Sequence, residues 1–319
     1  MFKGFELRDG QLHERTEPEA AAAANIHVYI NPSGEERAYL VNSLGIDEYD
    51  LNSALDAEEI SRVETEPDRI FIVWKRPNVF SLAQNRVFEG TSVGILMQND
   101  RVTLILGDDS LPFGERKYKP GRTLHEFVIH FLLHTVHHYL AHLRAIKAIS
   151  KELQVKLNTS MENAYFLQMF ALSESLIYYV NAIEANGGVL SRLHMIAEKR
   201  GFSPEEVELL GDAVIENRQC LRQAEIHAAV LSGLMDARGN IINNNMNVLL
   251  KNLTIINIVF LPLNLIASMG GMSEYSAWSD ALGMPHWLSY AFFTLLMAVL
   301  GWGTWVFLIN RIERGPRTQ

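Results

Sequence analysis

The chain has 319 residues, a net charge of -9 and 48% hydrophobic residues, and its mean hydropathy of +0.02 lies near the border between soluble and membrane proteins. The negative charge argues against general binding of nucleic acid, which requires a basic surface. A single cysteine, Cys220, excludes an internal disulfide and a multi-cysteine zinc site. The start of the chain has no apolar h-region, so we expect no cleaved signal peptide and a charged part that stays in the cytoplasm.

Residues 1–122 are predicted to form a cytoplasmic α/β domain. Alternating and branched residues indicate strands, and capped periodic stretches indicate short helices. The expected strands are residues 26–31, 60–65, 69–74, 87–97 and 102–106, and the expected helices are residues 35–44 and 46–55. We therefore expect a mixed sheet with helices, followed by a Gly-, Pro- and Lys-rich link at 111–122.

Residues 123–248 are predicted to be a helical region and stalk. Helices are expected at 123–149, at 153–184 with an end at Asn186-Gly187-Gly188, and at 190–199. The sequence Ser-Pro-Glu-Glu at 203–206 is then a strong helix start, with a serine N-cap, a proline at the first position and acids in the first turn. Because the next clear breaker is Pro262, we expect a stalk helix that is far longer than a small domain is wide and that enters the membrane.

Two stretches near the C-terminus are long and apolar enough to cross a membrane, namely residues 249–269 and 287–309. The loop between them, 270–286, has two acidic residues and no Lys or Arg, whereas the tail at 310–319 has three arginines. By the positive-inside rule the loop is expected outside, in the periplasm, and both termini in the cytoplasm. The tryptophans toward the ends of the second stretch agree with membrane interfaces.

Polar residues follow one face of the stalk and of the first span. Alternating steps of three and four residues, which stay near one side of a helix, trace this face. Its members are Asp236, Asn240, Asn243, Asn247, Leu250, Thr254, Asn257, Leu261, Asn264 and Ser268. A lipid-facing helix has no use for amides, which need partners in hydrocarbon. The pattern favours a pore lined by copies of this helix, and the alternative is that these residues bond across packed helices.

Histidines gather on one face of the helix predicted at 123–149. His130, His134, His138 and His142 recur every four residues, with His137 alongside. Two histidines at this spacing can share a zinc ion, and a cytoplasmic sensing site would be the role. The run lacks the glutamate of His-Glu-x-x-His, which excludes a metalloprotease. The alternative is a solvated or packed helix face that binds nothing, and we find no catalytic constellation elsewhere.

The spans and the soluble part together resemble the CorA-type divalent metal ion transporters, whose superfamily includes the ZntB branch and CmaX-like members. The sequence LLKNLTIINIVFLPLNLIASMGGMS at 249–273, an acidic loop and a second span are similar to the C-terminal signature of that family. Residues 46–77 and 103–113 are similar to segments of its soluble domain. The resemblance implies a funnel-shaped homopentamer in the inner membrane, with a cytoplasmic α/β domain, long helices and a pore made by the first membrane helix.

The resemblance also implies roles for single residues. Asp236 matches an acidic ring at the cytoplasmic end of the pore, and Asp212 matches a stalk carboxylate that binds metal between protomers in some members. Leucines between polar rings suit a gate that closes by dewetting, although they are also ordinary packing residues. The positions that match the pore face of the family are Asn247, Leu250, Leu253, Thr254, Leu261 and Asn264.

The outer mouth departs from the family pattern. The family carries Gly-Met-Asn after the first span, and here the matching residues are Gly271, Met272 and Ser273. A ring of serine hydroxyls is wider and weaker than a ring of amides, so selectivity for hydrated magnesium is in doubt. Glu274 and Asp280 carry negative charge that would concentrate cations at this mouth, and the alternative is that they are single loop acids without a role.

These observations predict a non-enzyme that transports divalent cations through a pentameric pore. Zinc is slightly favoured over magnesium, because the outer ring is altered and a histidine helix is present. The expected partners are copies of the chain, the bilayer and the transported or regulatory Zn²⁺ or Mg²⁺, with no permanently bound cofactor and no nucleic acid. The alternatives are a non-conducting membrane sensor or scaffold and a channel of low selectivity.

Overall fold

The computed structural model describes residues 1–78, 90–98, 100–109, 111, 113, 118–159 and 163–313. The chain divides into two compact units, Met1–Met235 and Asp236–Gln319. The first unit contains a sheet and a helical bundle, and the second contains the two candidate membrane helices. The long helix α6 belongs to both units.

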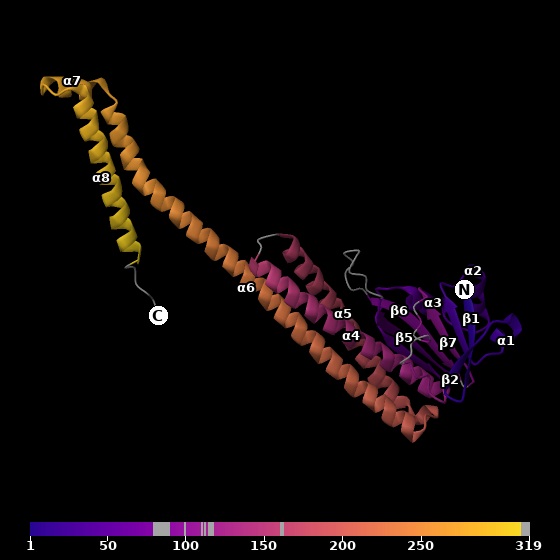
Figure 1. The fold of residues 1–319 in the computed structure, drawn as a ribbon. Coiled ribbons are helices and arrows are strands. Elements are labelled where there is room, and N and C mark those ends of the chain that lie inside the picture. Colours follow the sequence, from indigo (N-terminus) through magenta and orange to yellow (C-terminus); the bar gives the residue numbers. More distant parts are fainter. Residues whose placement is uncertain are drawn as a thin grey trace. The chain divides into compact units, whose positions relative to one another are not determined.

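The sheet has seven strands in the order β2-β1-β3-β7-β6-β5-β4 (Figure 1). Neighbouring strands are antiparallel except β3 and β7, which are parallel and pair Val28 with Leu104. The strands are β1 Phe2–Arg8, β2 Gln11–Arg15, β3 Ile26–Ile30, β4 Arg62–Glu66, β5 Arg69–Pro77, β6 Gly90–Gln98 and β7 Val102–Leu106. The prediction of a mixed sheet is confirmed.

The sequence prediction missed the first hairpin. Strands β1 and β2 are joined by Asp9 and Gly10, which both have positive φ, at 51° and 75°. An Asp-Gly pair between two extended runs is a hairpin signal, and it could have revealed this element. Among the other strands, β4 starts two residues later than predicted. Residues 87–89 of the strand predicted at 87–97 lie outside the described residues, as do 112 and 114–117 of the predicted link.

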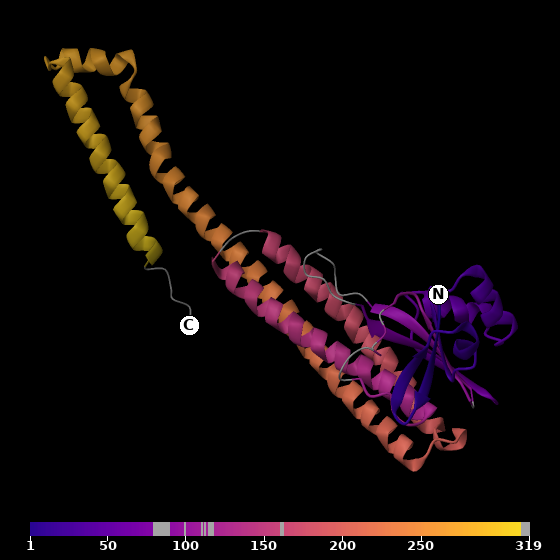
Figure 2. The ribbon, with the colours of Figure 1, turned by 45° about the vertical axis from the view of Figure 1, so that its right-hand side comes forward.

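Helices cover both faces of the sheet (Figures 1 and 2). On one face, α2 (Gly34–Asn42) and α3 (Glu48–Leu55) bury Leu40, Leu51 and Ala54 against the strands. The short α1 (Pro18–Ala22) packs beside β1. On the other face, buried residues of the long helices join the sheet in the larger core. The α/β domain is therefore a three-layer arrangement in which apolar side chains of the strands are buried on both faces.

The bundle of the first unit consists of α4 (Leu124–Thr159), α5 (Asn163–Ile196) and the first half of α6 (Pro204–Gly270), with the 3-10 turn η3 (Glu198–Arg200) before α6. The three helices run side by side (Figure 2) and share a second core that includes Tyr139, Leu176, Tyr179, Cys220 and Leu231. The stalk prediction is confirmed, because α6 runs without a break from Pro204 through Pro262 to Gly270.

Two predicted helix breaks are wrong. Helix α4 continues through residues 149–153 to Thr159, and α5 continues through Asn186-Gly187-Gly188 to Ile196. A Cβ added at Gly187 would lie 3.0 Å from the Asn217 amide of α6, so glycine at this position permits a close approach of the two helices. The Asn-Gly-Gly sequence is thus a packing motif inside a helix and not a helix end.

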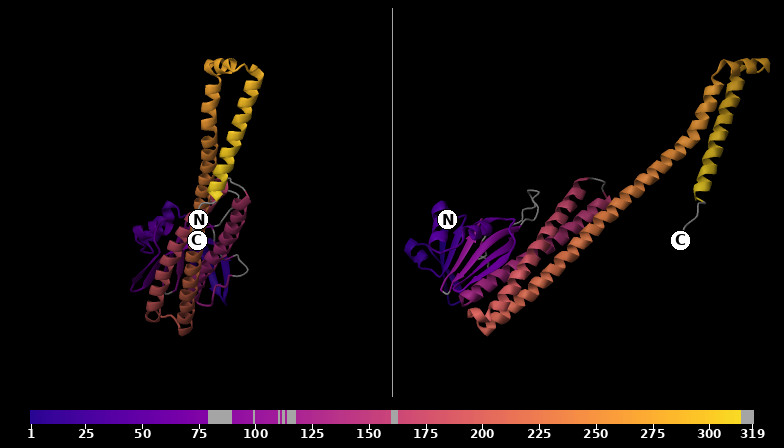
Figure 3. Two further views of the ribbon diagram at one scale, coloured as in Figure 1. Left: turned by 90° about the vertical axis from the view of Figure 1, so that its left-hand side faces the viewer. Right: turned by 180° about the vertical axis from the view of Figure 1, so that it is seen from behind.

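The second unit contains the membrane half of α6, then α7 (Ser273–Ala281) and α8 (His286–Glu313). Figure 3 shows α8 beside the end of α6, with α7 between them in the chain. Helices α6 and α8 each contain a segment long and apolar enough to cross a membrane, and only 6% and 0% of these segments is buried inside the chain. The predicted outer loop therefore contains a helix, and residues 314–319 of the predicted tail lie outside the described residues.

Candidate pore and cation sites

The membrane half of α6 presents one face to α8 and leaves the opposite face exposed. Val259 is buried and Leu263 is half-buried, and a Cβ added at Gly301 of α8 would lie 3.2 Å from Leu263 Cδ1. At about 100° per residue, Asn257 and Leu261 point about 160° away from Val259. The polar stripe of the sequence therefore lies on the side of α6 that faces away from α8.

The predicted pore residues are all exposed in the single chain: Asp236, Asn240, Asn243, Asn247, Leu250, Leu253, Thr254, Asn257, Leu261, Asn264 and Ser268. The Thr254 hydroxyl donates a hydrogen bond within the helix, to the Leu250 carbonyl at 2.8 Å. By contrast, Asn247, Asn257 and Asn264 find no side-chain hydrogen-bond partner among the residues that the structure describes. Such amides require water or a neighbouring chain, because hydrocarbon offers no hydrogen bonds.

The predicted outer mouth is a short connection between two helices, α6 and α7. Gly271 and Met272 continue the turn that ends α6, and Met272 is the N-cap of α7 without a side-chain cap. Ser273 Oγ donates to Glu274 Oε2 at 3.4 Å, and both residues are exposed. Glu274 lies in the first turn of α7, where its negative charge complements the helix dipole. The mouth thus presents a hydroxyl and a carboxylate close together.

The histidines of α4 have separate environments. His142 is buried, and its Nδ1 lies 2.7 Å from the Tyr179 hydroxyl of α5. Burial lowers the pKa of His142 to about 4. The His134 ring packs edge-on against Tyr118, whereas the His138 ring packs against His142 with centroids 4.5 Å apart. Half-buried His130 also has a pKa lowered by burial.

No group of three or more His, Cys, Asp or Glu side chains in the described ranges is close enough to hold a metal ion. His130, His134, His138 and His142 therefore do not form such a group, and a site made of two of them stays a prediction. A face with a histidine every fourth residue extends over about 18 Å of helix, too far for one ion. Asp212 and Asp236 are exposed on α6, and neither belongs to such a group among the described residues.

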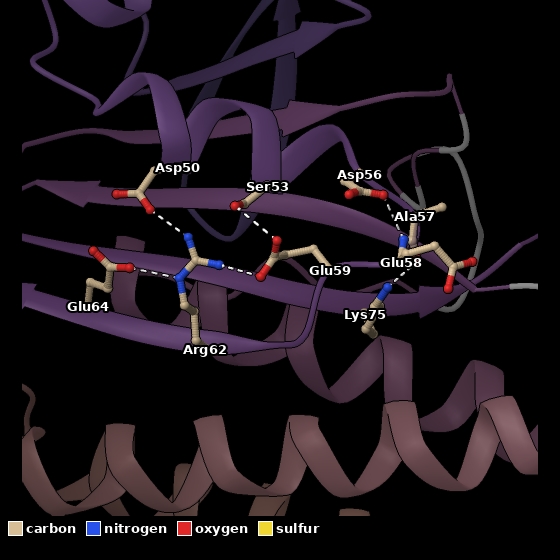
Figure 4. A network of polar contacts seen from close by, with 9 residues as sticks. All are labelled: Asp50, Ser53, Asp56, Ala57, Glu58, Glu59, Arg62, Glu64 and Lys75. Carbon is tan, nitrogen blue, oxygen red and sulfur yellow. Dashed lines mark hydrogen bonds and ion pairs between the residues drawn. The ribbon is translucent and has the colours of Figure 1, made fainter.

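The α/β domain contains an ion-pair network that no sequence pattern predicted (Figure 4). Arg62 contacts Asp50 at 2.6 Å, Glu59 at 2.9 Å and Glu64 at 2.7 Å. Burial raises the pKa of Asp50, against the opposing effect of Arg62. The guanidinium takes the position between the carboxylates that a bound cation would otherwise take, so this cluster supports the fold.

Buried Lys75 extends this polar region along β5. Its Nζ donates to the Ala57 carbonyl (Figure 4). Burial lowers the pKa of Lys75, whereas nearby Glu58, Asp56 and Glu59 oppose that shift. These contacts hold the segment after α3 against the sheet.

Comparison with known proteins places this architecture in one family. The model of the family described as "CorA-like Mg2+ transporter protein" matches residues 25–311. A cobalt/magnesium transport protein CorA of Methanocaldococcus jannaschii is 27% identical over 256 residues, which are 76% of this chain and 78% of that protein. The matched range includes most of the sheet, the bundle and both membrane helices.

Solved structures have the same fold. The complete CorA magnesium transporter of Methanocaldococcus jannaschii aligns with a TM-score of 0.76 and 21% identity over 99% of this chain and 98% of that one. A full-length CmaX protein aligns with a TM-score of 0.69 and 15% identity, covering 98% of this chain and 97% of that chain. The ZntB cytoplasmic domain of Vibrio parahaemolyticus aligns with 76% of this chain and 98% of its own, with a TM-score of 0.60 and 11% identity. With its stalk helix, its two C-terminal spans and a family match along nearly its whole length, this chain belongs to the CorA-like Mg²⁺ transporters.

Proposed function

We propose that copies of this chain form a membrane pore for divalent cations, as a funnel-shaped homopentamer around α6. The observation that carries the proposal is the exposed polar face of α6, which points away from α8. If α8 faces lipid and neighbouring helices, the opposite side of α6 is available for a central axis. Asn247, Asn257 and Asn264 then contact water and the passing ion, which supplies the partners that their amides need.

The donors on this face favour hard cations. Asparagine, threonine and serine provide oxygen ligands, which suit Mg²⁺ and other ions that keep part of their hydration shell. The relative from Methanocaldococcus jannaschii is named for cobalt and magnesium. The slight preference for zinc depends in part on the histidine face, where the described residues include no group of three or more possible metal ligands. We therefore rank magnesium and cobalt ahead of zinc as the transported ions.

The remaining sequence-based assignments fit the same pore. Asp236 supplies an acidic ring at the cytoplasmic end, and Asp212 supplies one ligand of a regulatory site between protomers. The leucines of the stripe form apolar rings that close by dewetting. Both termini lie in the cytoplasm and the protein lies in the inner membrane, in agreement with the charge difference between the loop and the tail. The outer mouth consists of Gly271, Met272, Ser273 and Glu274.

Reconstitution tests this proposal directly. The purified full chain in liposomes is assayed with fluorescent indicators for Mg²⁺, Co²⁺ and Zn²⁺ in separate preparations. We expect influx of at least one ion above that of empty vesicles, and Asn264→Leu should abolish it because an apolar ring replaces an amide ring. Absence of flux for all three ions would contradict the proposal, and wild-type flux in Asn264→Leu would contradict the assigned pore face.

A channel of low selectivity is the second candidate, and Ser273 favours it. A hydroxyl at this position is shorter than the amide that the family pattern carries, so the ring around the axis is wider. The ratio of Mg²⁺ to Na⁺ flux in the same liposomes distinguishes the two candidates. A high ratio supports a divalent cation transporter, and a ratio near unity supports the low-selectivity channel.

A further inference from the structure

The phenol of Tyr275 fastens α7 to α8. Its hydroxyl donates to the Ser289 carbonyl at 3.2 Å and accepts from the Ser289 hydroxyl at 3.0 Å. Ser289 is only 7% exposed and lies in the first turns of α8. The carbonyl and the hydroxyl of Ser289 are therefore both engaged by a single side chain from the preceding helix.

Aromatic packing supports the same contact. The ring centroid of Tyr275 lies 5.3 Å from that of Phe293 and 5.9 Å from that of Tyr290, both on α8. A third ring, Trp278 of α7, lies 6.5 Å away. These separations fall within or near the range of favourable aromatic pairs. Hydrogen bonds and ring packing thus both hold Tyr275 against α8.

Tyr275 directly follows the mouth in the chain. Its backbone N–H donates to the Met272 carbonyl at 3.2 Å, which closes the turn around Ser273 and Glu274. The other end of the mouth is continuous with α6, because Gly271 and Met272 donate to carbonyls of its last turn. The mouth is consequently held at both ends, by α6 on one side and by Tyr275 on the other.

We propose that Tyr275, through its contact with Ser289, is a positioning residue that fixes where Ser273 and Glu274 meet entering cations. This inference rests on the proposed transport function. In a helix as short as α7, a rotation or a lift from α8 moves Glu274 with it, because consecutive residues share one rigid turn. A ring of weak hydroxyl ligands needs such fixation more than a ring of amides does, since site geometry determines selectivity among hydrated cations.

The flux test uses Tyr275→Phe in full-length protein, because this change removes both hydrogen bonds and keeps the ring. We expect the apparent KM for Mg²⁺ to rise about threefold or more with a maximal rate within about twofold of wild type, the pattern of impaired recognition with an intact conduction path. Ser289→Ala removes the hydrogen bond that the Ser289 hydroxyl donates and keeps the bond to the Ser289 carbonyl. Its effect on the apparent KM should therefore be smaller and in the same direction. The control Thr294→Val removes a hydroxyl of α8 that, among the described residues, bonds to its own helix alone, at the carbonyls of Tyr290 and Ala291.

A second measurement does not depend on transport. Ser273→Cys is labelled with a membrane-impermeant maleimide, with and without Tyr275→Phe, while buried Cys220 stays unreactive. Tyr275→Phe should loosen α7 from α8 and so change the rate at which the cysteine at position 273 is labelled. Thr294→Val should leave that rate unchanged. If the wild type shows no flux, the proposed function fails, and the labelling rates alone decide the positioning role.

Unchanged KM values together with unchanged labelling in Tyr275→Phe would overturn the inference. If Tyr275→Phe does not assemble, as judged by size-exclusion chromatography, the same two measurements on Ser289→Ala decide. An equal loss in Thr294→Val would assign the effect to general stability of α8, which also overturns the inference.

Discussion

The side-chain amide of Asn186 on α5 pairs with both backbone groups of Lys75 on β5. Asn186 Nδ2 donates to the Lys75 carbonyl at 2.8 Å, and the Lys75 N–H donates to Asn186 Oδ1 at 3.1 Å. The pairing of β4 with β5 starts at Arg62 and Val73, so the edge of β5 is open at Lys75. Asn186 takes the place of the missing strand, and it also accepts from the Ser61 hydroxyl at 2.7 Å.

Replacement of Asn186 should destabilise the first unit. Asn186→Leu leaves the buried carbonyl of Lys75 without its Asn186 donor and leaves the Lys75 N–H only its bond to Ser61 Oγ at 3.2 Å, which costs about 1–3 kcal/mol. Thermal unfolding followed by far-UV circular dichroism measures the loss. Asn181→Leu, at an exposed position of the same helix, should unfold like the wild type, and equal curves for Asn186→Leu would show that this contact is dispensable.

The stability of the bundle should decline with acidification because of His142. The pKa of His142 is about 4 in the folded protein, below the ordinary value near 6.5 of an unfolded chain. Between these values the unfolded chain binds a proton that the folded chain does not. The free energy of unfolding should therefore fall by up to about 3 kcal/mol as the pH drops from about 6.5 to about 4.

The variant His142→Phe isolates this contribution. Its stability should vary less with pH in that window than the stability of the wild type, because the group that titrates is gone. His13→Gln, at an exposed position of β2, serves as the control and should keep the wild-type pH profile. An unaltered profile in His142→Phe would assign the acid sensitivity to other groups, beginning with neighbouring His138.

Two asparagines of α6 test which face lines the pore. Asn257 lies on the exposed stripe, and Asn252 is only about 20° from the direction of Val259, toward α8, at about 100° per residue. Asn257→Leu should reduce Mg²⁺ flux in liposomes at least tenfold, because it adds an apolar ring to the conduction path. Asn252→Leu should retain most of the flux. Reversed results would place the axis on the other side of α6.

Two glycines of α8 test the packing of the membrane helices. A Cβ at Gly301 meets Leu263 of α6 at 3.2 Å, whereas a Cβ at Gly303 meets nothing within 4 Å. A larger side chain at Gly301 separates the helices, as expected where small residues permit close approach. Gly301→Leu should lower the temperature at which the detergent-solubilised oligomer dissociates. Gly303→Leu should change it little, and equal losses would refute a specific contact at Gly301.

The local sequence was sufficient to predict those features that depend on the pattern of neighbouring residues. The spans follow from apolar length, and the stripe from Asp236 to Ser268 follows from the helical repeat, so both could be predicted without a fold. The start of α6 at Pro204 follows from capping chemistry within one turn. Membership of the transporter family agrees with the signature at residues 249–273.

Other features depended on partners that are distant in the chain. The Asn186-Gly187-Gly188 sequence has the composition of a helix end, but contacts with β5 and α6 keep it helical. The histidines of α4 share a face by spacing, yet buried His142 hydrogen-bonds to Tyr179 of α5, and the ring of His134 packs against Tyr118. Tyr275 has no local signal for its bond to Ser289, because that bond requires α7 to fold back onto α8.

The sequence by itself determined that this is a two-span membrane protein with a polar helical face, because hydrophobic length and helical period are properties of neighbouring residues. Only the tertiary structure decided that this face points away from α8 and that the Tyr275 hydroxyl bonds to Ser289. Both features depend on contacts between side chains of different helices, which form only when the helices pack. The spacing of residues along one helix does not specify which helix packs against each of its faces.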